Sequence, residues 1–235
     1  MGTHYINRWR NTASRLANNN STSDMDIALF SPASLFAADG DSSDGETTET
    51  SQNFVERNHQ FPGIELQIRE FGFHQLNANL LWPGALAIFL KKEFNLDITT
   101  SDYNDQEIED NIVHNCIANK IIPSLPHIKH TWGDEFPISE PDWDLIIASD
   151  ILLYVKQYPN LIKSLTFLLK KYKPTNVVSP AEDTELPRPV FLMSWRRRIG
   201  KDDESLFFTG CEEAGLEVKH LGNRVYCIKL RESNL

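Results

Sequence analysis

The sequence predicts a doubly wound α/β fold, in which helices cover both faces of a mostly parallel β-sheet. Short apolar strands alternate with amphipathic helices from about residue 84 to residue 221, the pattern of parallel strands joined by crossover helices. The last two strands, Leu216–Leu221 and Arg224–Leu230, are separated only by Gly222-Asn223. Such a short turn makes a hairpin, so we expect the final strand to be antiparallel.

Length and composition limit the kinds of protein that fit. The chain has 235 residues and a net charge of −10, enough for one such domain and a tail, without the basic stripe of a nucleic-acid binder. Its best apolar run, Ala85–Leu90, is far shorter than the roughly 18 residues that indicate a membrane span. Three cysteines, an odd number, indicate free thiols in a reducing compartment. We therefore expect a cytoplasmic monomer without nucleic-acid or membrane partners, with the nucleus as a further location.

Residues 1–53 are predicted to be a disordered tail. From Asp24 to Glu56 there are eight acids and no base, and Asp39–Ser51 is almost wholly polar. Such a segment buries too little apolar surface to offset its ordering entropy. Residues 1–23 carry arginines and no acid, so a transit peptide is the alternative for that part.

Residues 54–235 are predicted to form the folded domain, beginning with an accessory hairpin over 54–71. Ile64–Phe71 alternates apolar and polar residues, with Ile64, Leu66 and Ile68 on one side. This pattern is typical of a half-buried antiparallel strand, and Pro62-Gly63 supplies a turn that pairs it with Phe54–Arg57.

The central feature is a glycine turn followed by a helix and a strand. Pro83-Gly84 precedes an apolar helix over about Ala85–Phe94, and the strand Asp97–Ser101 ends on Asp102. From Gly84 to Asp102 is 18 positions, near the roughly 20 that separate a glycine loop from a ribose-binding carboxylate in nucleotide-binding units. No apolar strand precedes Gly84, however, and no G-x-G pattern occurs in the chain.

The next helix is predicted over Gln106–Lys120. Its apolar positions recur at helical spacing and should form the buried stripe: Ile108, Ile112, Val113, Cys116 and Ile117. A short strand fits His127–Thr131. His127 and His130 lie three apart and would face opposite sides of it, so we expect no metal site.

The remaining elements complete the alternation. Leu145–Ala148 is predicted to be a fully buried strand with Ser149-Asp150 at its carboxyl end. The others, in order, are helix Pro159–Tyr172, strand Val190–Trp195 and helix Asp202–Ala214, which Gly215 ends. Arg196-Arg197-Arg198 is expected to be a solvated loop.

These features resemble the seven-β-strand S-adenosylmethionine (AdoMet) methyltransferases, and among them the protein-lysine methyltransferases of chaperones, AAA ATPases and calmodulin. The resemblance covers about Ile64–Leu230 and implies a Rossmann-like fold. Five segments carry it: Leu81–Gly84, Thr100–Asp105, Asn111–Asn115, Trp132-Gly133 and Asp144–Asp150.

The resemblance implies AdoMet as cofactor, a lysine-bearing protein as substrate, and a set of site residues. Trp82, Gly84, Asp102, Trp132 and Ser149 would bind the cofactor, with Asp102 on the ribose hydroxyls and Trp132 beside the adenine. Asp150 would begin the family's acidic D-x-x-Y motif near the methyl-transfer site. Tyr154 stands one position later than the tyrosine of that motif.

One departure from the family pattern has large consequences. The strand ending in a glycine-rich E-L-G-x-G-x-G loop is absent, as if Trp82-Pro83 were joined directly to its last glycine. A skipped exon would produce this pattern. The missing strand would be central, between the strands Asp97–Ser101 and Leu145–Ala148, and we expect Leu80–Trp82 to be drawn into its place.

Without the glycine loop, AdoMet affinity should fall severely, because that loop brings backbone amides to the cofactor. Three functions stay open: an AdoMet-dependent protein-lysine methyltransferase, impaired in this chain; a non-catalytic methyltransferase-like binding protein; and another nucleotide-binding protein such as a dehydrogenase. The closing hairpin and the lack of G-x-G-x-x-G count against the last.

Overall fold

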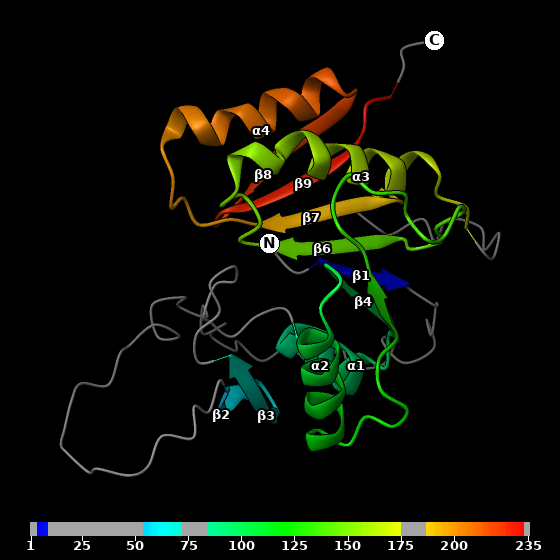
Figure 1. Cartoon of the computed structure of the whole chain (residues 1–235), viewed down its shortest axis with the longest axis vertical. Coiled ribbons are helices and arrows are strands. Elements are labelled where there is room, and N and C mark those ends of the chain that lie inside the picture. Colours follow the sequence, from blue (N-terminus) through cyan, green and yellow to red (C-terminus); the bar gives the residue numbers. More distant parts are fainter. Residues whose placement is uncertain (1–3, 9–53, 72–83, 175–186, 233–235) are drawn as a thin grey trace, which may run out of the picture. The chain divides into compact units, whose positions relative to one another are not determined.

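A computed structural model describes residues 4–8, 54–71, 84–174 and 187–232 (Figure 1). They form a mixed α/β structure with one seven-stranded sheet and a separate two-stranded hairpin. The sheet strands are β1 (His4–Arg8), β4 (Asp97–Asp102), β5 (His127–Lys129), β6 (Leu145–Ser149), β7 (Val190–Ser194), β8 (Leu216–Gly222) and β9 (Val225–Leu230). The hairpin is β2 (Phe54–Phe61) with β3 (Ile64–Phe71). The helices are α1 (Gly84–Phe94), α2 (Gln106–Ala118), α3 (Tyr158–Lys170), α4 (Lys201–Glu213) and a 3₁₀ turn, η2 (Val155–Gln157).

The strands of the large sheet lie in the order β5-β4-β1-β6-β7-β9-β8. β4 and β5 are parallel, as are β6 and β7. β9 is antiparallel to both of its neighbours, β7 and β8, as the short turn between the last two strands predicts. The place between β4 and β6, where the sequence lacks its expected first strand, is occupied.

The occupant of that place is β1, which pairs antiparallel with β4 on one side and β6 on the other (Figure 1). His4–Arg8, which lies within the predicted disordered range 1–53, is a strand in this structure. The rest of that range, like Leu80–Trp82, lies outside the described residues. The physical reason is that buried backbone groups need hydrogen-bond partners. Two facing strand edges inside a sheet leave buried N–H and C=O groups without partners, at about 1–3 kcal/mol each, so even a polar strand that pairs with them is favoured.

Both faces of the sheet are covered, as the doubly wound fold requires. In β6, Ile146 packs in the core beneath α3 and α4, with Phe191 and Phe207. Its neighbour Ile147 faces the other side and touches the core around α1 and the hairpin. Adjacent residues of a strand point to opposite faces, so these two contacts show a helix layer on each side.

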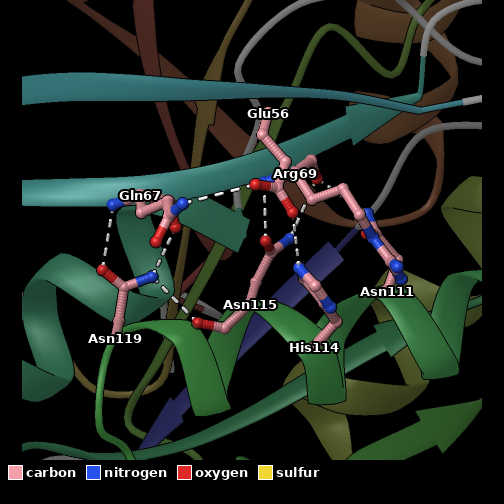
Figure 2. Close-up of polar contacts among 7 residues, drawn as sticks. All are labelled: Glu56, Gln67, Arg69, Asn111, His114, Asn115 and Asn119. Atoms are coloured by element: carbon pink, nitrogen blue, oxygen red, sulfur yellow. Dashed lines mark hydrogen bonds and ion pairs between the residues drawn. The ribbon is translucent and has the colours of Figure 1, made fainter.

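The hairpin is attached to α2 through asparagine side chains that act as a substitute strand (Figure 2). Asn119 Oδ1 accepts the Gln67 N–H at 3.1 Å, and its Nδ2 donates to the Gln67 carbonyl at 2.6 Å. One turn earlier, Asn115 makes the same two bonds with Arg69, at 2.7 and 3.0 Å. Asn111 Nδ2 also donates to the Arg69 carbonyl at 3.1 Å, and its Oδ1 accepts from Arg69 Nε at 2.8 Å. The outer edge of β3 is thus paired without a neighbouring strand.

This asparagine ladder (Asn111, Asn115 and Asn119) corrects the predicted buried face of α2. Ile108 and Cys116 are buried, but Val113 is 38% exposed and Ile117 is 58% exposed. Asn111 and Asn115 are buried in their place. Polar residues can be buried here because the β3 edge satisfies both ends of each amide.

Candidate active site

Two predicted site residues lie at the same edge of the sheet. Asp102 ends β4, and Asp150 directly follows β6. Since both strands are antiparallel to β1, they run in the same direction, and their carboxyl ends lie on either side of the amino end of β1. With strands about 4.8 Å apart, the two strand ends are separated by about 10 Å.

Asp102 is enclosed. Its exposed fraction is 1%, and its Oδ1 accepts the backbone N–H of Tyr103 at 2.8 Å. The next acid, Asp105, caps α2 by accepting the Glu107 N–H at 2.8 Å. It also accepts from the Tyr103 hydroxyl, and burial together with this bond raises the pKa of that phenol. The expected ribose carboxylate is therefore placed at a strand end but shielded from solvent.

Asp150 is held by an arginine loop that the sequence prediction treated as solvated. Its backbone is left-handed, with φ at +50°. This conformation costs a non-glycine residue of order 1 kcal/mol, and it is found more often at functional sites than elsewhere. Oδ1 accepts the Arg196 N–H at 3.1 Å, and Oδ2 forms an ion pair with Arg198. The prediction of a solvated loop is confirmed, because Arg196, Arg197 and Arg198 are exposed and follow the end of β7. The pairing of Arg198 with this carboxylate was not predicted.

A second ion pair fixes the same loop. Glu204, in the first turn of α4, is only 4% exposed. It accepts from Trp195 Nε1 at 2.7 Å and pairs with Arg197. An ionised carboxylate is buried only when paired, so Arg197 and Trp195 together explain Glu204. None of these partners was predicted.

Trp132 is a core residue, 6% exposed, beside a small cavity of about 20 Å³. A cavity of this size holds about one water molecule, so this cavity by itself does not accommodate an adenine. Gly133 has φ at +89°, and a Cβ there would lie 2.6 Å from Asn160 Oδ1. The Trp132-Gly133 motif thus has a structural role in the contact between this loop and α3.

The other predicted site residues are placed as follows. Gly84 is the half-buried first residue of α1, and Ser149 is the last residue of β6. Tyr154 immediately precedes η2, and burial raises the pKa of its phenol. Trp82 lies outside the described residues.

The carboxylate at the end of β4 suits the ribose hydroxyls of AdoMet in kind, since it can accept their hydrogen bonds, but in this structure it is shielded from solvent. β1 also brings its amino end to the edge where the family has its glycine loop. Over the described ranges, no group of three or more metal-ligating side chains is present. In the same ranges, no helix is long and apolar enough to cross a membrane.

Comparison with known proteins identifies the family. The profile of a family described as lysine methyltransferase matches residues 83–213, which include Asp102, Trp132 and Asp150. The chain is also similar to the protein N-terminal and lysine N-methyltransferase efm7 of Aspergillus fumigatus, with 30% identity over 105 residues. That match covers 39% of this chain and only 40% of the length of the relative. The family match spans more than half of the chain, and the chain therefore belongs to the lysine methyltransferase family.

Proposed function

We propose that this chain is an AdoMet-dependent methyltransferase that acts on a lysine side chain of another protein, with much weakened affinity for its cofactor. The observation that carries the proposal is the placement of Asp102 and Asp150 at the carboxyl ends of two co-directed strands, within the residues that match the family. In open α/β sheets, ligands bind outside the carboxyl ends of the strands.

In this proposal the two acids have different tasks. Asp102 accepts hydrogen bonds from the ribose hydroxyls once its carboxylate becomes accessible. Asp150 receives the ammonium group of the substrate lysine, a position that the Arg198 guanidinium holds in this structure. Both are cations, so exchange of one for the other keeps the carboxylate paired. The bound ammonium group must first lose a proton to solvent, because only the neutral amine has the lone pair that can accept a methyl group. AdoMet, when bound, would supply that methyl group from its sulfonium and leave as the neutral thioether.

Weak cofactor binding follows from two features. The sequence has no G-x-G pattern, and the strand that fills the central place runs in the opposite direction to β4 and β6. A strand in that direction does not lead into a loop at the cofactor edge. Backbone amides that would approach the cofactor there are therefore lost.

A methylation assay with radiolabelled AdoMet and cell lysate tests the proposal. We expect label in protein lysines only at high AdoMet concentration, and none with Asp102→Asn. Glu217→Gln is the matched control, because it removes the charge of an acid on β8 that lies far from the carboxyl ends of β4 and β6. It should behave as the unchanged chain. If Asp102→Asn incorporates label as well as the control does, the role proposed for Asp102 is wrong.

A second candidate is a non-catalytic methyltransferase-like protein that binds other proteins. The 1% exposure of Asp102 and the engagement of both Asp150 oxygens favour it. No label at any AdoMet concentration, in a chain that melts cooperatively, would support this candidate over the enzyme.

A further inference from the structure

We propose that β1 is an exchangeable strand, and that the facing edges of β4 and β6 form an interaction surface for the same segment, His4–Arg8, of a second copy of this chain. The two copies would each donate β1 to the other, which is a domain-swapped dimer.

The surface is defined by the register of the two edges. Residues 4–8 pair with 101–97 of β4, and residues 4–7 pair with 148–145 of β6. At the centre, Ile6 lies between Thr99 and Ile146. Each edge offers main-chain groups that need a strand between them. A strand from the same chain or from another chain can form these main-chain hydrogen bonds equally well.

The composition of β1 makes it an ill-matched occupant. A strand with neighbours on both sides and both faces covered is normally an apolar run, as in Leu145–Ala148 of β6. β1 instead carries His4, Asn7 and Arg8 among its five residues. Main-chain pairing, which is not specific to sequence, is thus the chief attraction that β1 has for this place. Short, polar segments of this kind are weakly specified in their pairing.

The connection to the rest of the chain permits exchange. About 45 residues separate Arg8 from Phe54, and a chain of that length spans at most roughly 150 Å when fully extended. Chain length alone therefore does not prevent β1 from reaching a neighbouring molecule. A second copy competes when the protein is concentrated.

Disulfide trapping with the full chain tests this inference. Ile6→Cys and Thr99→Cys are made in separate chains, because these two positions are register partners. The variants are mixed, unfolded, and refolded together at high and at low protein concentration under mild oxidation. In a chain with both substitutions, an intramolecular disulfide shows that β1 lies between β4 and β6. The matched control replaces Thr99→Cys with Glu217→Cys on β8, at the far edge of the sheet.

We expect a disulfide-linked dimer from the Ile6→Cys and Thr99→Cys mixture after concentrated refolding, at least several-fold above the control mixture and above dilute refolding. Light scattering should show the unchanged chain as a dimer fraction under the same conditions. An intramolecular disulfide in the double variant without any mixed dimer would overturn the exchange. Absence of both disulfides would overturn the placement of β1 as well. The three buried native cysteines are common to all mixtures, so the control accounts for them.

Discussion

The asparagine ladder makes a prediction that can be worked out bond by bond, through Asn115→Ala. This change removes the acceptor of the Arg69 N–H, at 2.7 Å, and one donor to the Arg69 carbonyl, at 3.0 Å. The carbonyl keeps Asn111 Nδ2 at 3.1 Å, so one backbone group, the N–H, loses its partner. An unpaired buried donor costs about 1–3 kcal/mol. Alanine favours the helix over asparagine by about 0.5 kcal/mol. The net expected loss of unfolding free energy is about 0.5–2.5 kcal/mol.

Urea unfolding measures the loss, and hydrogen exchange followed by mass spectrometry locates it. We expect the amides of β2 and β3 to exchange faster in Asn115→Ala, while those of β7 and β9 keep their protection. Ile117→Ala is the matched control, because this side chain lies on the same helix and is 58% exposed; it should change stability by less than about 0.5 kcal/mol. If both variants have the same urea midpoint and the same exchange in the hairpin, the ladder does not hold the hairpin to α2.

Two further changes test local features. Gly133→Ala should destabilise the fold by about 2–4 kcal/mol, because it combines a left-handed backbone with a Cβ placed 2.6 Å from Asn160 Oδ1. Gly215 has a similar φ but open space around the position of a Cβ. The smaller loss of melting temperature in Gly215→Ala therefore measures the cost of the backbone conformation alone. Burial lowers the pKa of His130, so its neutral form is favoured in the folded chain. Above the unfolded pKa of about 6.5 this histidine is neutral in both the folded and the unfolded chain, so its burial costs no stability. As the pH falls below that value, the unfolded chain binds the proton more readily, and the free energy of unfolding falls by up to about 1.4 kcal/mol per pH unit. Urea midpoints of His130→Asn across this pH range should fall less steeply than those of the unchanged chain. Equal slopes in the two chains would contradict the burial argument.

The order of the helices and most strands could be predicted because each rests on local patterns. Leu145–Ala148 is apolar throughout, and Gly222-Asn223 separates two strands by a hairpin turn. Each of these features is contained within a few consecutive residues. The inward face of α2 could not be predicted in the same way. Apolar spacing selects Val113 and Ile117, but besides the apolar core around Cys116 this helix also contacts a strand edge. Nothing in the α2 sequence alone reveals that edge.

The vacant central place was predictable, whereas its occupant was not. The missing strand follows from the absence of an apolar run before Gly84. The strand that fills the gap is held by hydrogen bonds to the backbone groups of β4 and β6. Since the backbone of any segment can make such bonds, the side chains of His4–Arg8 do not reveal that this segment is the occupant. Its partners lie about 90 or more positions away in sequence.

For the candidate site, the positions of Asp102 and Asp150 at strand ends followed from the sequence, but their surroundings did not. The ion pair between Asp150 and Arg198 joins residues 48 positions apart, and the shielding of Asp102 depends on packing between several elements. Long-range partners of this kind are set by tertiary structure. A basic loop that follows a strand is nevertheless worth testing against acids at the neighbouring strand ends.

Isothermal titration of AdoMet into the purified chain measures the affinity on which the proposed function depends. Because Asp102 is proposed to bind the cofactor without the help of a glycine loop, we expect millimolar or weaker binding that Asp102→Asn abolishes. Micromolar binding by the unchanged chain would contradict this expectation.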